Sequence, residues 1–115
     1  MKRILEGVIQ HFQTSCETTD QWAKFARMFK HDFKKFLKPY TKAVDIYRGH
    51  FFMSGFFELN NGKIYYFSIS DVRFSPRSPM LIRTAKSFKD FTGGSNGYIH
   101  FDENFEQNLL QIIKT

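Results

Sequence analysis

The N-terminal third of the chain carries apolar residues at the spacing of amphipathic helices. Between residues 3 and 14 they recur three or four positions apart, which predicts a first helix. A second helix is predicted from Thr19 to Lys38, because its aromatic residues fall within one arc of a helical wheel and Pro39 ends it. Thr18, followed three residues later by Gln21, is a capping-box pattern at its start. The aromatic arc predicts that this helix packs on a core.

From about residue 43 the period of the pattern changes to two, which is typical of strands. Asn60, Asn61 and Gly62 form a hairpin turn signal between two of these segments. A C-terminal helix is expected to follow the last strand, with Asp102 as its N-cap and an acidic first turn. The predicted strands are residues 43–48, 50–59, 63–72, 80–85 and 98–101.

This order of elements predicts an α+β fold with two N-terminal helices, a sheet of four to five mainly antiparallel strands, and one C-terminal helix. With no repeat or internal linker, residues 1–115 are expected to form a single domain. One face of the sheet should pack on the helices. Bulky residues at both parities of 51–57 and 64–69 indicate that the second face is also occupied. Residues 71–80 or a second copy in a homodimer would cover it, or its rings would stack on unpaired bases.

The distribution of charged residues is most informative on the second predicted helix. The net charge of +6 favours a polyanionic partner, such as nucleic acid, an acidic protein or an anionic membrane surface, and charge alone does not distinguish them. The cations of this helix fall opposite its aromatic arc, with His31 among them and Asp32 at the edge. Lysines dominate, which suits phosphate contact better than base-specific recognition, although a solvated surface is the alternative explanation. These cations are Lys24, Arg27, Lys30, Lys34, Lys35 and Lys38.

A basic, glycine-rich loop joins the last two predicted strands. Glycines permit positive φ and expose backbone N–H groups, and Arg83, Lys86 and Lys89 add positive charge, so we expect an anion site within residues 83–97. The spacing matches neither the P-loop nor the dinucleotide fingerprint, so no nucleotide cofactor is expected. The alternative is a mobile connecting loop. The other expected ligand-binding residues of this loop are Thr92, Gly93, Gly94 and Ser95.

Catalysis is an alternative class of function. Cleavage of RNA without a metal ion needs an acid, a base and cations that stabilise charge on phosphorus. His50 and His100, with Arg83 and Lys86, are the candidates for such a ribonuclease, and structural histidines are the competing explanation. The chain has no zinc-protease or serine-hydrolase pattern, and its aspartates are too scattered for magnesium, so no metal is expected.

The order of two helices followed by an antiparallel sheet resembles, in topology only, the small barnase- and RelE-like ribonuclease domains. The pattern up to Lys38 and the strands after Ala43 carry this resemblance, and no family motif can be laid on individual residues. The small, basic and aromatic chain, with 15 Phe, also looks like the short accessory proteins of bacterial phages and mobile elements. That resemblance implies a further alternative, an inhibitor that binds an acidic host protein.

The sequence also bears on cellular location. Its single cysteine, Cys16, excludes an internal disulfide and a cysteine-rich zinc site and fits a reducing compartment. No apolar run approaches the ~20 residues of a membrane span, so a cytoplasmic protein without a membrane partner is expected. The function we expect first is that of a small binding protein. It would engage nucleic acid, or a nucleic-acid-processing complex, through the second helix and the glycine-rich loop.

Overall fold

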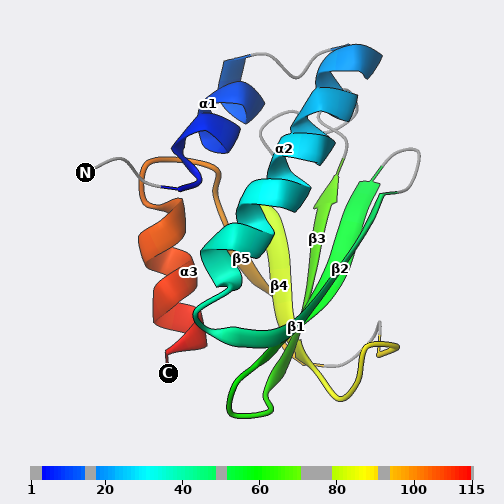
Figure 1. The fold of residues 1–115 in the computed structure, drawn as a ribbon, viewed down its shortest axis with the longest axis vertical. Coiled ribbons are helices and arrows are strands. Elements are labelled where there is room, and N and C mark those ends of the chain that lie inside the picture. Colours follow the sequence, from blue (N-terminus) through cyan, green and yellow to red (C-terminus); the bar gives the residue numbers. More distant parts are fainter. Residues whose placement is uncertain (1–3, 15–17, 49–51, 71–78, 91–93, 115) are drawn as a thin grey trace.

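Three helices lie on one side of a five-stranded sheet in the computed structural model of the chain, which describes residues 4–14, 18–48, 52–70, 79–90 and 94–114 (Figure 1). The order is two helices, the strands and a third helix, which confirms the predicted α+β fold. Cys16 and His50 lie outside the described residues, as do Thr92 and Gly93. The helices are α1 (Glu6–Thr14), α2 (Thr19–Leu37) and α3 (Phe105–Ile113).

Each strand pairs antiparallel with the next one along the chain, so the order in the sheet is β1-β2-β3-β4-β5. The predicted turn between β2 and β3 is present. Gly62 adopts a positive φ of 92°, which favours glycine, and its N–H donates to the carbonyl of Leu59 at 2.9 Å. The strands are β1 (Thr41–Arg48), β2 (Phe52–Leu59), β3 (Ile64–Ser70), β4 (Met80–Ala85) and β5 (Gly97–Ile99).

The capping box predicted for α2 is formed. The N–H of Gln21 donates to the Thr18 hydroxyl at 3.2 Å, and the N–H of Thr18 donates to the Gln21 side-chain oxygen at 3.1 Å. The box satisfies two donors, one at the N-cap and one in the first helical turn. The capping box fixes the residue at which α2 begins.

The cap predicted for α3 is wrong. Its N-cap is Asn104, and the Asp102 carboxylate instead accepts the N–H of Asn104 at 2.8 Å, which closes a turn before the helix. The last strand also ends early, at Ile99, because Phe101 joins the core, where its ring stacks on Phe105 at 4.8 Å. Packing of this one ring therefore moves the boundaries of both β5 and α3.

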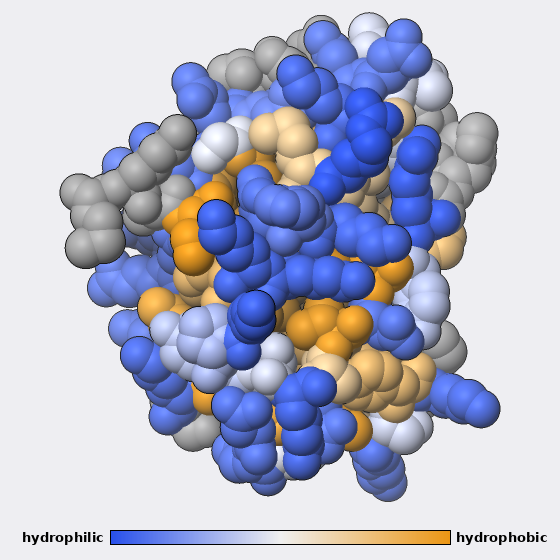
Figure 2. Space-filling view, in the orientation of Figure 1, coloured by the Kyte–Doolittle hydropathy of each residue, from blue (hydrophilic) through white to orange (hydrophobic). Residues whose placement is uncertain are grey.

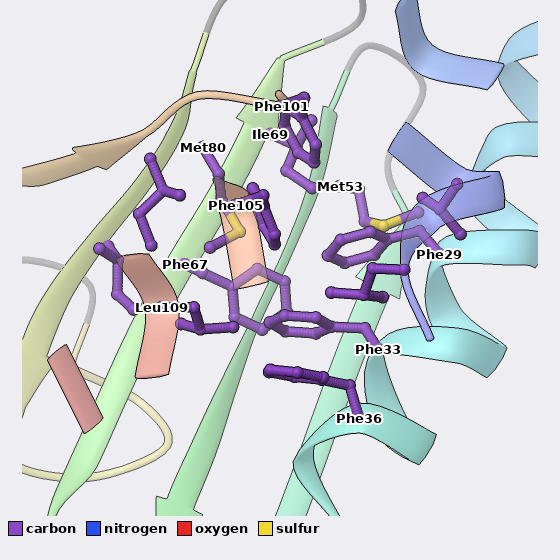
Figure 3. Close-up of a cluster of buried hydrophobic side chains, with 14 of the residues drawn as sticks. Phe29, Phe33, Phe36, Met53, Phe67, Ile69, Met80, Phe101, Phe105 and Leu109 are labelled. Carbon is purple, nitrogen blue, oxygen red and sulfur yellow. The ribbon is translucent and has the colours of Figure 1, made fainter. Parts of the chain in front are cut away.

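The aromatic arc of α2 packs on the inner face of the sheet. The rings of Phe29 and Phe33 stack at 4.5 Å, and Phe33 meets Phe67 of β3 edge-on at 5.1 Å. Figure 3 shows these rings reaching from α2 toward Met53 and Phe67 on the strands. Phe29, Phe33 and Phe67 have no exposed surface. Rings and apolar side chains thus fix α2 across the sheet and turn its opposite face to solvent.

The two outer helices are tied together by a buried carboxylate. Glu106, in the first turn of α3, is 8% exposed, and its Oε1 accepts the N–H of Leu5 at 3.3 Å. Leu5 directly precedes α1, whose first-turn N–H groups have no partners within the helix. Tyr65 of β3 adds a hydrogen bond from its hydroxyl to the carbonyl of Ile112 at 3.3 Å. α3 thus holds both the start of α1 and the sheet.

Candidate functional site

Five of the six predicted cations lie on the outward face of α2, and the sixth, Lys38, is the C-cap that directly follows the helix; all six are exposed. Figure 2 shows this side of the molecule, where hydrophilic side chains predominate over α2 with apolar surface between them. Asp32, half-buried, lies 2.8 Å from His31 Nδ1. On a helical wheel Asp32 lies on one flank, whereas Arg27 and Lys30 lie on the other. We call the six cations, Lys24, Arg27, Lys30, Lys34, Lys35 and Lys38, the basic face.

A pocket of about 210 Å³ opens beside this second flank, between α2 and the first two strands. Three cations surround it: Arg27 and Lys30 from α2, and the exposed Arg48 from β1. Within the described part of the chain, none of the three is paired with a carboxylate. An apolar lining comes from three buried residues, Ala26, Ile46 and Met53. We call this hollow the α2–β1 pocket.

Sequence reasoning missed Arg48. Alternation along β1 places Arg48 on the same side of the sheet as Ile46, which is the side that the helices cover. The available sequence signal was a cation at the end of an edge strand, at a position that alternation assigns to the core-facing side of the sheet. The neighbours of Arg48 depend on how α2 crosses β1. The local sequence pattern does not specify this crossing.

The glycine-rich loop is partly explained by packing. Gly94 has a φ of 77°, and a Cβ there would lie 2.6 Å from the Thr84 hydroxyl oxygen, so both backbone conformation and space require glycine. Arg83 donates from Nη1 to Asn96 Oδ1 at 3.2 Å and lies over the Tyr66 ring at 4.7 Å. These contacts engage the guanidinium within the protein.

The other cations of the loop remain open to solvent. Lys86 and Lys89 are exposed, as are Gly94 and Ser95. The Asp90 carboxylate accepts the backbone N–H of Lys86 at 2.9 Å, which places a negative charge inside the expected anion site. The described part of this loop is therefore less positive than its Lys and Arg content indicates.

The candidate catalytic residues do not come together within the described chain. Ile99 lies opposite Met80 and Gly97 opposite Ile82, so His100 and Arg83 lie at opposite ends of the β4–β5 pairing. At about 3.4 Å per residue, their backbones are about 14 Å apart along the strands. Lys86 lies farther in the same direction as Arg83. The exposed His100 therefore has neither cation beside it.

The outer face of the sheet carries a second aromatic group. Phe56 is fully buried there, with its ring 5.1 Å from Tyr66 and stacked on Phe88 at 5.6 Å. Phe88 lies in the turn after β4, so this turn covers part of the outer face, whereas residues 71–78 lie outside the description. We call this side of the sheet the outward sheet face, which includes Tyr47, Phe52, Phe56, Tyr66, Arg83 and Tyr98.

Exposed rings surround that covered centre. Tyr47, Phe52 and Tyr98 are 46%, 47% and 57% exposed. The hydroxyl of Tyr47 donates to Asp45 Oδ2 at 2.9 Å, and this hydrogen bond, with smaller contributions from burial and from the carboxylate charge, raises the pKa of Tyr47 above its ordinary value of 10.0. Lys42 Nζ lies 3.5 Å from Glu58. The outward sheet face is therefore aromatic, and these charged groups contact one another or neighbouring polar groups.

No protein-family model, curated protein or solved structure matches the chain. None of the helices in the described ranges is both long and apolar enough to cross a membrane. Within the same ranges, no group of three or more His, Cys, Asp or Glu side chains is placed to hold a metal ion. Function must therefore be inferred from the side chains and their geometry.

Proposed function

We propose that the protein binds nucleic acid through the basic face of α2. The observation that carries this proposal is the row of exposed cations along the outward face of α2. Among the described residues, these cations have no carboxylate partner. Clustered Lys and Arg on one face are the electrostatic footprint of nucleic-acid binding. A cytoplasmic location, expected from the sequence, fits such a role.

The spacing of the row suits a phosphate backbone. Side chains three or four positions apart on a helix lie about 5–6 Å from one another, so Arg27, Lys30, Lys34 and Lys38 follow one line along α2. The line is about 16 Å long at a rise of 1.5 Å per residue. Lysine ammonium groups contact phosphate as point charges and read few base edges. We therefore expect binding with little sequence preference.

The test neutralises four cations of the basic face together, as K24Q, R27Q, K34Q and K38Q. We measure fluorescence anisotropy of labelled single-stranded and duplex oligonucleotides over a range of salt concentrations. Four lost phosphate contacts should reduce the slope of log K against log salt by about 3, and lower affinity at about 0.1 M salt by ~10²–10³-fold. An unchanged affinity with an unchanged slope contradicts the proposal.

A matched control removes the same charge elsewhere, as K42Q, K63Q, K86Q and K89Q. All four lysines are exposed and lie outside α2. The control should lose much less affinity, because only the general potential of the protein falls. If the control loses more affinity than the α2 variant, the glycine-rich loop rather than the basic face is the main contact.

Two alternative functions are an inhibitor of an acidic protein and a ribonuclease. An acidic protein, such as the target of a phage-type inhibitor, would engage the same cations, so polyglutamate would then compete with the oligonucleotide at equal charge concentration. A ribonuclease would cleave a labelled RNA, and the H100A substitution would abolish the cleavage. We expect weak competition by polyglutamate, since flexible carboxylates lack the regular spacing of phosphates, and no RNA cleavage dependent on His100.

We also propose that two copies of the chain associate through the outward sheet face. Tyr47, Phe52 and Tyr98 present exposed rings there. The charges of this face lie beside partners within the chain, as Asp45 does beside Tyr47 and Glu58 beside Lys42. Two molecules that each carry a net charge of +6 meet with least repulsion on a face where charges balance. A symmetric pair would also leave both basic faces open to nucleic acid.

A further inference from the structure

We propose that the α2–β1 pocket binds a phosphomonoester, as the 5′-phosphate end of a nucleic-acid strand or as a free nucleoside monophosphate. Binding of a strand end depends on the nucleic-acid binding proposed above, whereas binding of a free nucleotide does not. The pocket lies at the flank of the basic face, and its lining combines Arg27, Lys30 and Arg48 with apolar side chains. This combination differs from the open row of lysines on the rest of α2.

The charge of the pocket favours a dianion. Three cations from two elements line one hollow, and within the described residues no carboxylate neutralises any of them. An internal phosphodiester carries one negative charge, which a single cation of the row balances. A phosphomonoester carries about −1.5 to −2 at pH 7 and three acceptor oxygens. Two of the three cations are arginines, and each planar guanidinium group can bind two phosphate oxygens at once.

The apolar lining favours a terminal group over the middle of a strand. Ala26, Ile46 and Met53 are packed into the core and offer no hydrogen-bond donor to a second phosphate. At about 210 Å³ the pocket is smaller than the ~300–1,000 Å³ that holds a drug-sized ligand. It therefore has room for one small group, such as the sugar of a terminal nucleotide or part of its base. Met53, with its flexible thioether, can adapt to that group.

The test compares one single-stranded oligonucleotide with a 5′-phosphate and with a 5′-hydroxyl end, and adds adenosine monophosphate as a separate probe. We expect the 5′-phosphate to raise affinity about tenfold at about 0.1 M salt. The preference should disappear in R48Q, because Arg48 contacts the pocket and not the row along α2. It should also decline as the pH falls below about 6, where the phosphomonoester dianion takes up one proton and becomes a monoanion.

The matched control is K38Q, which removes an exposed cation of α2 outside the pocket. It should weaken both oligonucleotides by the same factor and leave their ratio unchanged. Thermal unfolding checks that R48Q, an exposed position, retains the fold.

The outcomes separate this inference from the function on which it partly rests. Equal affinity for the two strand ends, with no binding of adenosine monophosphate, overturns the pocket inference while nucleic-acid binding stands. Binding of adenosine monophosphate that R48Q abolishes, without binding of either strand, supports the pocket and overturns the proposed function. If neither strand nor nucleotide binds, both proposals fail.

Discussion

The outward face of α2 and the outward sheet face lie on opposite sides of a molecule that is 20 Å across its shortest axis, along which Figure 1 is viewed. Among the described residues, the first face is positive and exposes no Phe, Tyr or Trp side chain. The second has exposed rings, and charged groups beside these rings contact partners within the chain. The sequence places lysines and aromatic residues close together along the chain. The fold separates them. A single nucleotide therefore cannot contact the basic face and the exposed rings at the same time, which favours separate partners for the two faces.

The largest expected effect is on stability, and it compares the core on the inner side of the sheet with the outward sheet face. Phe33→Ala removes a fully buried ring at the centre of the core and should lower the free energy of unfolding by about 3–5 kcal/mol. Phe88 is half-buried and covers Phe56, so Phe88→Ala should lower the free energy of unfolding by about 1–2 kcal/mol. Urea unfolding measures both. Phe52→Ala, at an exposed position, serves as the control and should change little. A larger loss for Phe88→Ala would show that the outward sheet face is the better-packed side.

Self-association should be sensitive to the outward sheet face alone. Substituting Tyr47, Phe52 and Tyr98 together by Ser removes the exposed rings without emptying the core, so a mass that rises with concentration should return to that of the monomer. Light scattering over a concentration series measures this. The α2 variant K24Q/R27Q/K34Q/K38Q should associate as the unmodified protein does. A strict monomer at high concentration before any substitution would contradict the dimer.

The glycine-rich loop should respond to phosphate less strongly than the basic face. Lys86 and Lys89 are exposed, but Arg83 contacts Asn96 and Tyr66, and Asp90 adds a negative charge. We expect amide resonances of residues 94–96 to shift on titration with phosphate, saturating at millimolar or higher concentration, and not with chloride. K86Q with K89Q should reduce these shifts. Equal responses to the two anions would mean that the loop is a connector.

The smallest effect concerns the hydrogen bond between Tyr47 and Asp45. Asp45→Asn removes the carboxylate that raises the pKa of Tyr47, so that pKa should fall toward 10.0, as followed by the ultraviolet absorbance of tyrosinate. Because the folded pKa is raised, its contribution to stability is complete below pH 10 and is lost as the pH rises through the folded value. Asp32→Asn, on the opposite side of the molecule, is the control and should leave the titration of Tyr47 unchanged.

The sequence was sufficient where the governing interactions are local. The start and the two faces of α2 follow from the capping box at Thr18 and from helical periodicity, and the β2–β3 turn follows from Gly62. The α2–β1 pocket was not predictable, because it depends on how a helix crosses a strand that follows it in the chain. The cover over Phe56 was missed for a related reason. Phe88 is one aromatic residue in a turn, and only the folded register shows which ring it meets.

The hydrogen bond between Leu5 and Glu106 joins residues 101 positions apart, whereas every strand pairs with its neighbour in sequence. These two kinds of contact imply an order of events in folding. Hairpins close short loops and form early, while docking of α1 on α3 closes nearly the whole chain and carries the larger loop entropy. The same difference in loop entropy predicts the order of unfolding. α1 should be released in partial openings that leave the strands paired, so the Leu5 amide should exchange with solvent sooner than the amides of β2 and β3.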